Sequence, residues 1–439
     1  MKMLEVARQA VAVAQKKGAQ QAAANAYRAR EVSVEWRDGK VDRLNEATTA
    51  GLGVQLYVDG RFASVSTSDL RPEALDRFLE DAIVLARALA KDPHRALPDP
   101  RLYEGQAQLD LMLEDKGYEA VSAVERRRMA QVMEEGARAQ KGAEAIISVT
   151  SGVSDTLSES YKVHSNGFEG SRRDTAFWLS AEVSVKDPDG RKPEDGDYAG
   201  ARFFKELPDP AAIGRAAAQR ALKRIGAKKG ESGLMTVVID PRAGGRLLPQ
   251  LLGPLSASSL QQKRSMFEGK LGQAIGSARL DIADDPHVVK GFGSQLYDSE
   301  GMAAKRRPIF EGGVLKTYFV DNYYGRKLGM APTTARTSNL AWKLGDKDLA
   351  QTVAGLKDGL LVTGFLGGNS NATTGDFSLG VSGFRVRGGA LAEPVSEMNL
   401  SGNHLELWKS LVAVGNDPYP YSSMRIPTLV FEKVQVAGT

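Results

Sequence analysis

Two hydrophobic periods alternate along the first half of the chain. Apolar residues recur at helical spacing over residues 2–17 and again over 72–91. Between these stretches the period falls to two, because apolar and polar residues alternate over 31–36. The same order then returns after a proline-rich stretch, with helical spacing over 119–140, strands within 145–186, and helical spacing over 208–226. One helix–strand–helix unit therefore occurs twice.

This order predicts an α+β fold for the N-terminal domain, residues 1–228, with antiparallel strands and duplicated halves at 1–95 and 110–228. A stretch of glycine and charged residues, GAKKGESG at 226–233, has no apolar face and marks the linker to a second domain.

The second domain, 233–439, is rich in glycine and in short apolar runs. These runs predict strands at 289–297, 307–320, 360–366, 377–386 and 428–436, with a short helix over 321–328. The expected architecture is a mostly antiparallel sheet or barrel that wraps a central helix.

The central helix is predicted at about 242–262. It follows a β-rich run, Thr236 to Ile239, and a break at Asp240-Pro241. The helix carries leucine at helical spacing, at positions 247, 248, 251, 252 and 255. So many leucines on one element predict a place at the centre of the C-terminal core.

Composition narrows the class of protein. The 439 residues are 42% hydrophobic and 26% charged, as in globular proteins, and the formal net charge is only +4. A net charge this small does not indicate the basic surface that direct nucleic-acid binding requires. No run reaches the roughly 18 apolar residues of a membrane span, and the N-terminus is typical of an amphipathic helix, not of a signal peptide. The absence of cysteine excludes disulfides and thiolate chemistry but does not fix the compartment. Without a targeting segment, we expect a cytoplasmic protein by default.

Candidate catalytic chemistry is sparse. The four histidines, His94, His164, His287 and His404, include no two at metal-ligand spacing. Carboxylates occur in Asp298-Ser299-Glu300-Gly301 and in Asn416-Asp417-Pro418. Their position beside glycine, asparagine and proline is typical of residues that cap turns and less typical of a catalytic acid–base pair. The chain also lacks a G-x-S-x-G elbow and a Walker loop.

Several short motifs, taken together and in order, resemble the TldD/PmbA family, whose members are also described as modulators of DNA gyrase or U62-type peptidases. The motifs are GLGVQLYVDGR at 51–61, YDSEG at 297–301, YGRKLG at 324–329, TGDFS at 374–378, PVSE at 394–397 and VGND at 414–417. They span almost the whole chain.

The resemblance implies a zinc motif on the central helix. TldD-type members carry His-Glu-x-x-x-His there, and the two histidine positions fall on Pro249 and Pro254, while the glutamate position falls on Gln250. Proline offers no lone pair to a metal, and a glutamine amide takes no proton from water near neutral pH. The third TldD-type ligand is a cysteine, which this chain lacks. We therefore expect the non-catalytic PmbA (TldE) branch, with no catalytic residue, metal or other cofactor of its own.

The same resemblance implies that zinc belongs to a TldD-like protease partner, in a heterodimer, and that unfolded peptides or peptide precursors are the substrate; a homodimer stays open. The candidate substrate-facing or partner-facing residues are Gln250, Gly253, Asp298, Glu300, Asn416 and Asp417. Two alternatives remain open. One is a stand-alone metallopeptidase with other ligands, and the other is a modulator of DNA gyrase that acts by binding protein.

Overall fold

The computed structural model describes residues 2–438. The N-terminal domain contains α1 (Met3–Lys16), β1 (Gln21–Arg37), β2 (Lys40–Val58), β3 (Arg61–Thr67) and α2 (Pro72–Ala88), then α3 (Ala123–Arg138), β4 (Ile146–His164), β5 (Glu169–Val185), β6 (Glu194–Ala201) and α4 (Pro210–Leu222). The predicted duplication is confirmed, because a helix, three antiparallel strands and a helix occur twice.

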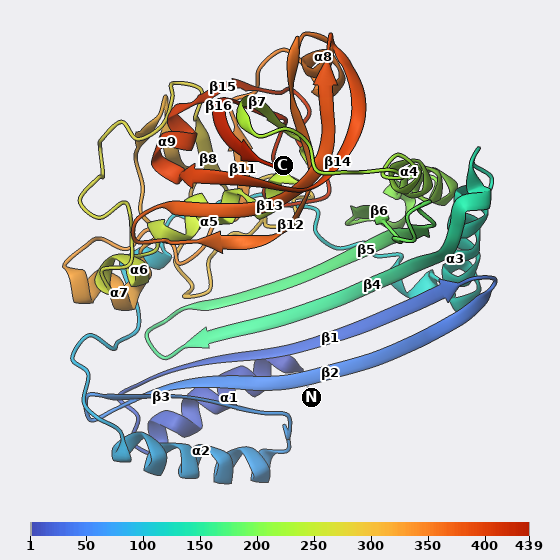
Figure 1. Cartoon of the computed structure of the whole chain (residues 1–439). Coiled ribbons are helices and arrows are strands. Elements are labelled where there is room, and N and C mark those ends of the chain that lie inside the picture. Colours follow the sequence, from blue (N-terminus) through green and yellow to red (C-terminus); the bar gives the residue numbers. More distant parts are fainter. Residues whose placement is uncertain (1, 439) are drawn as a thin grey trace.

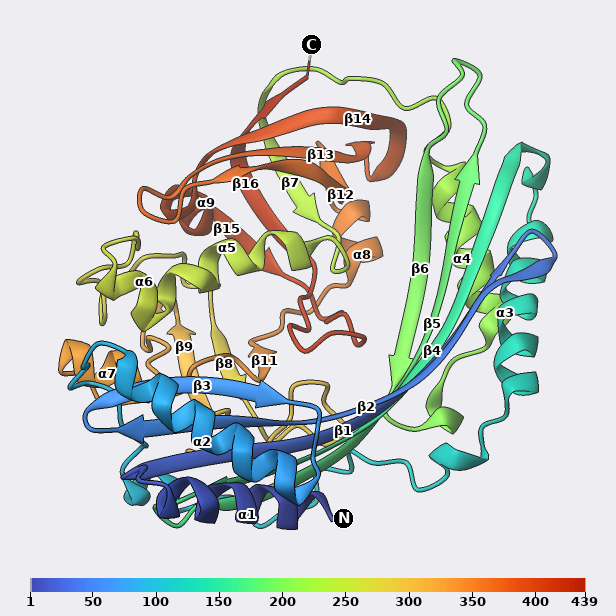
Figure 2. The ribbon, with the colours of Figure 1, turned by 90° about the horizontal axis from the view of Figure 1, so that it is seen from below.

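Both halves share one six-stranded sheet. Its order is β3-β2-β1-β4-β5-β6, so the first strand of each half pairs with the other at the centre, over Ala23↔His164 to Arg37↔Thr150. The helices cover the outer face of this curved sheet, and the C-terminal domain lies on its concave side (Figures 1 and 2). Each half packs its own apolar core beneath its helices.

The C-terminal domain is built mainly from strands. Its elements are β7 (Gly233–Ile239), α5 (Leu248–Leu252), α6 (Ala257–Gln261), β8 (Ile282–Asp285), β9 (Arg307–Glu311), β10 (Val314–Leu315), α7 (Asn322–Leu328), β11 (Asn339–Trp342), α8 (Leu349–Ala354), β12 (Asp358–Ser370), β13 (Asp376–Arg387), β14 (Ala390–Asn403), α9 (His404–Lys409), β15 (Leu411–Val414) and β16 (Leu429–Ala437). One sheet has the order β14-β13-β12-β7-β16-β15, and β14 also pairs with β16, which closes a barrel. A four-stranded sheet, β10-β9-β8-β11, lies beside it.

The leucine-rich stretch lies in the C-terminal core, as predicted. Leu247, Leu248, Leu251, Leu252 and Leu255 all belong to one buried cluster with residues of the barrel. Burying side chains of this size contributes about 1.5–3 kcal/mol each. The stretch therefore anchors the barrel to the smaller sheet.

The helix predicted at about 242–262 is broken into shorter pieces. After α5 the chain tightens into a 3₁₀ turn, Gly253–Leu255, and Ser256 is extended (φ −71°, ψ 139°). Pro254 lacks the N–H that would continue the helical ladder, and the hydroxyl of Ser256 accepts from Ser259 N to start α6. The free backbone of the break pairs with a neighbouring segment, because Ala257 N donates to Phe319 O and Phe319 N to Leu255 O.

The strand predicted over 289–297 is wrong, since this segment is an irregular loop. Lys290 has a left-handed φ of 60°, and a side chain on Gly293 would lie 2.2 Å from Ser338 O. Phe292 of this loop stacks on Trp178 of β5 in the N-terminal sheet and takes no part in a strand ladder. Within residues 2–438, no helix is long and apolar enough to cross a membrane.

Candidate functional site

The segment aligned with the zinc motif lies on α5 and the turn after it. Pro249 and Gly253 are exposed, Gln250 is half-buried and Pro254 is buried. Figure 2 shows α5 on the side of the C-terminal domain that faces the long sheet. Just before α5, Arg242 forms an ion pair of 2.7 Å with Asp197 of β6, which fixes this end of the segment against the N-terminal domain.

The donor set of α5 does not fit a zinc ion. Two of the three aligned positions are prolines without a side-chain ligand atom, and the third, Gln250, carries a neutral amide. Among residues 2–438, no three side chains of histidine, cysteine, aspartate or glutamate are arranged to hold one metal ion. The exposed face of α5 therefore offers contact surface and one amide.

Asp298 and Glu300 lie in a turn between the two domains. Oδ1 of Asp298 accepts from Glu300 N at 2.9 Å and from Met302 N at 3.0 Å, and Oε2 of Glu300 accepts from Asn322 N at 2.8 Å. Lys162 of β4 donates to the carbonyl oxygen of Ser299 in the same turn. The interpretation of Asp298 as a turn-capping residue is confirmed.

Burial changes the acidity of this group of side chains. It raises the pKa of Glu300 to about 7, with Asp298 and Asp321 adding repulsion. It also raises the pKa of Asp298 and lowers the pKa of Lys162. Oδ2 of Asp298 is buried and has no hydrogen-bond partner within residues 2–438. Glu300 in this turn can therefore change charge near neutral pH.

Asn416 and Asp417 close a different turn, between β15 and β16. Oδ2 of Asp417 accepts from Leu349 N and from the Thr428 hydroxyl, both at 2.8 Å, and Oδ1 accepts from Thr428 N at 3.0 Å. Asn416 Nδ2 donates to Asp346 O at 3.0 Å. The carboxylate of Asp417 is thus occupied in joining the turn to the start of α8.

The histidines are scattered among structural contacts. His164 Nδ1 lies 3.1 Å from the Tyr103 hydroxyl, and burial lowers its pKa to about 3. His404 is fully buried at the start of α9, and its Nε2 lies 2.9 Å from the Ser370 hydroxyl. Burial lowers the pKa of His404 to about 4, so it is a weak base at neutral pH.

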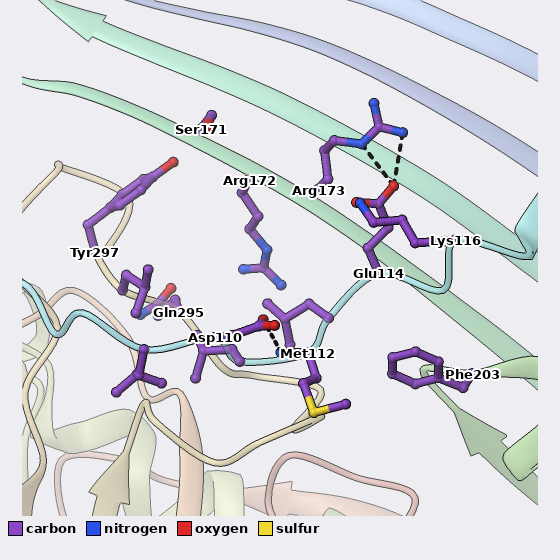
Figure 3. Close-up of a pocket in the computed structure, with 14 residues that line it drawn as sticks. Asp110, Met112, Glu114, Lys116, Ser171, Arg172, Arg173, Phe203, Gln295 and Tyr297 are labelled. Atoms are coloured by element: carbon purple, nitrogen blue, oxygen red, sulfur yellow. Dashed lines mark hydrogen bonds and ion pairs between the residues drawn. The ribbon is translucent and has the colours of Figure 1, made fainter.

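A cavity of about 530 Å³ lies where the two domains meet (Figure 3). Its walls come from β5, from the segment 109–114 and from the loop 295–297. Most of the lining is apolar, with Leu109, Leu111, Met112, Phe203, Leu296 and Tyr297. A volume of this size is typical of a ligand pocket, and charged side chains at its rim, among them Asp110, Glu114 and Arg172, add polar groups to the apolar walls. We call it the interdomain pocket.

Arg172 supplies a positive charge at the interdomain pocket. Its Nε donates to Asp174 at 2.9 Å, and the other oxygen of Asp174 accepts from buried Arg202 at 2.9 Å. Two guanidinium groups thus share one carboxylate, which leaves one positive charge in excess. Figure 3 shows the end of Arg172 directed into the space between Tyr297 and Met112.

The predicted site residues are not brought into one place. Gln250 and Gly253 lie on α5, Asp298 and Glu300 lie in the interdomain turn, and Asn416 and Asp417 lie between β15 and β16. Their role toward substrate or partner stays a prediction. The sequence reasoning missed Arg172 and the segment 109–114, and no local pattern marks them, because only the tertiary fold brings them together.

Comparison with known proteins covers nearly the whole chain. Three family models match, described as the PmbA/TldA metallopeptidase domain 1 at residues 22–86, the central domain at 116–225 and the C-terminal domain at 232–438. Metalloprotease PmbA of Escherichia coli O157:H7 is 29% identical over 414 residues, which are 93% of this chain and 90% of that protein.

Solved structures agree with these matches. A crystal structure from Bacteroides thetaiotaomicron, of a protein named as a modulator of DNA gyrase, has a TM-score of 0.96 and 42% identity, covering 99% of this chain and 98% of that one. TldE from Thermococcus kodakarensis has a TM-score of 0.83 over 99% of this chain and 100% of that one, and at 19% identity it shows the shared fold alone. The chain belongs to the PmbA/TldD family.

Proposed function

We propose that the chain is the non-catalytic, TldE-like subunit of a TldD/TldE-type complex that processes unfolded peptides or peptide precursors. One observation carries the proposal: the positions aligned with the zinc motif are Pro249, Gln250 and Pro254, which cannot ligate zinc or activate water. In this role zinc and the catalytic glutamate belong to a TldD-like partner.

The exposed face of α5 is the surface proposed to meet the partner or its substrate. Pro249 and Gly253 are exposed there, and no hydrogen bond from the Gln250 side chain is found within residues 2–438. The leucines on the other face hold this surface rigidly on the barrel core. A rigid presenting face reduces the entropy lost on association.

The first test combines metal analysis with proteolysis of an unfolded peptide. The purified chain alone should contain no stoichiometric zinc and cleave nothing, whereas a mixture with a TldD-like protein should cleave the peptide. Stoichiometric zinc with chelator-sensitive cleavage by the chain alone would overturn the proposal and favour a stand-alone metallopeptidase.

A variant pair tests the surface on α5. Gln250→Arg places a bulky charge on the proposed face and should lower cleavage by the mixture about tenfold, as expected when an unpaired charge is buried in an interface. Gln262→Arg, at the exposed end of α6, is the matched control and should leave cleavage unchanged. Equal activity of both variants would remove α5 from the contact surface.

A further inference from the structure

One edge of the long sheet is open beside the interdomain pocket. Strand β6 pairs with β5 only from Phe177↔Ala201 onward, so no strand among residues 2–438 lies on that side of residues 169–174 of β5. Thr175 N donates to Leu113 O at 2.9 Å, and Thr175 O accepts from Arg202 at 3.0 Å. The backbone groups of Thr175 therefore point away from β4.

The backbone groups of two further residues of β5 point away from β4 as well, because the direction alternates along a strand. In an antiparallel ladder, backbone groups of every second residue point to the same side. Ser171 and Arg173 share the parity of Thr175, so their N–H and C=O groups also point away from β4, toward the pocket that both residues line. Such a row of backbone groups is a template for an added strand.

The open edge ends abruptly. At Thr175 the position that an added strand would occupy is taken by Leu113, which accepts from Thr175 N. The segment 109–113 therefore blocks an added strand from continuing along β5. A strand that adds along Ser171 and Arg173 cannot run past this point, so a chain end fits here and a chain interior does not. The choice between the two ends of a peptide follows from charge.

The charge at the closed end favours a carboxylate, because the pocket lining carries three cations, Lys116, Arg172 and Arg173, against two carboxylates, Asp110 and Glu114, and Glu114 already pairs with Lys116 and Arg173. Arg172 shares Asp174 with Arg202, and the proximity of Arg172 contributes to lowering the pKa of Arg202. No hydrogen bond to Nη1 or Nη2 of Arg172 is found within residues 2–438. An arginine with both terminal nitrogens available binds a carboxylate through two parallel hydrogen bonds. An amino terminus would instead add a second positive charge.

We propose that the β5 edge at Ser171–Arg173 and the interdomain pocket together bind the C-terminal end of an extended peptide. The peptide backbone pairs with β5, its last, apolar side chain enters the pocket between Leu109, Met112, Phe203 and Leu296, and its terminal carboxylate pairs with Arg172. The inference deepens the proposed function and rests on it, because peptide is the substrate class there.

The experiment measures binding of N-terminally labelled five-residue peptides to the full chain by fluorescence polarisation. A peptide that ends in leucine with a free carboxylate should bind saturably. The same peptide with an amidated C-terminus should bind about tenfold more weakly, because a charge-assisted pair is lost. N-methylation of its backbone amides should weaken binding by a similar factor, because strand addition needs those donors.

Two protein variants complete the test. Arg172→Gln should weaken binding of the free acid about tenfold and remove its advantage over the amide. Arg71→Gln, an exposed arginine on another element, is the control and should bind as the unaltered chain does. Thermal melting checks that both variants fold, and if Arg172→Gln does not, the two modified peptides decide alone.

Equal affinity for the acid and the amide, or no saturable binding up to about 1 mM, would overturn the proposal. Because this assay uses the chain alone, its failure leaves partner-dependent cleavage untouched. Conversely, binding that persists while the mixture cleaves nothing would remove the proposed role in proteolysis and keep the peptide site.

Discussion

Glu300 holds a proton more firmly in the folded chain than in the unfolded one. Burial raises its pKa from 4.5 to about 7, while Asn322 N, which donates to the carboxylate, and Lys162 act in the opposite direction. A raised carboxyl pKa means that the folded state binds the extra proton. The stability from this group is therefore complete below about pH 4.5 and is lost as the pH rises through 7.

Glu300→Gln tests this linkage. The amide oxygen can still accept from Asn322 N, but the variant has no charge to bury at high pH. We expect the variant to match the unaltered chain near about pH 4 and to be more stable by on the order of 3 kcal/mol near about pH 8. Urea unfolding at both pH values measures this, and an identical pH dependence for the two proteins would contradict it.

At the scale of elements, helices α3 and α4 cross at two glycines. A Cβ on Gly214 would lie 1.8 Å from Met133 O, and a Cβ on Gly136 would lie 2.5 Å from Ala211 O. Only residues without a side chain permit this approach. The close crossing lets one compact pair of helices cover the second half of the sheet.

Gly214→Ala should therefore destabilise the chain by about 2 kcal/mol, because separating two helix backbones outweighs the roughly 1 kcal/mol of helix propensity gained. Gly253→Ala is the matched control. Gly253 has helical angles (φ −57°, ψ −45°), and no atom of residues 2–438 outside its immediate neighbours lies within 4 Å of an added Cβ, so alanine should be neutral or slightly stabilising. Denaturant midpoints compare the two, and an unchanged midpoint for Gly214→Ala would refute the packing argument.

At the scale of the whole molecule, buried Arg202 joins the two domains. Its guanidinium donates to Asp174 on β5 and to the carbonyl oxygens of Gly291 (3.2 Å) and Phe292 (2.9 Å) in the C-terminal domain. Phe292 also stacks on Trp178 at 4.8 Å. The loop that contains Phe292 therefore fastens the barrel to the long sheet.

Arg202→Met should cost about 3 kcal/mol, because it leaves buried carbonyl groups without donors. It should also separate the thermal unfolding of the two domains, which calorimetry would record as two transitions in place of one. Arg71→Gln serves again as the control and should keep a single transition. One transition at an unaltered temperature for Arg202→Met would show that other contacts join the domains.

Sequence patterns predicted much of this architecture, because most elements bury one face. The two periods placed α1 to α4 and the long strands, and the leucine spacing placed α5 in the core. The loop at 289–297 escaped prediction, since it depends on partners far along the chain, such as Trp178. The break at Ser256 has local causes, Pro254 and the Ser256 cap, but the leucine spacing indicates a helix on both sides of it.

The candidate site was less accessible to sequence reasoning. The sequence alone shows that Pro249 and Pro254 cannot ligate zinc, because proline has no side-chain donor atom in any conformation. The interdomain pocket cannot be read in this way, because β5, segment 109–114 and loop 295–297 meet only in the folded chain. The parity of Ser171 and Arg173 at the open edge also depends on strand register.

The central pairing of β1 with β4 relates the two halves of the N-terminal domain by an approximate twofold axis. Two equivalent strands that face each other antiparallel are related as the subunits of a twofold symmetric dimer are. The N-terminal domain thus has the form of such a dimer made continuous by one connecting stretch of chain. Within residues 2–438 both halves leave part of their second strand unpaired on its outer side, residues 40–51 of β2 and 169–174 of β5, and only the stretch on β5 lines the interdomain pocket.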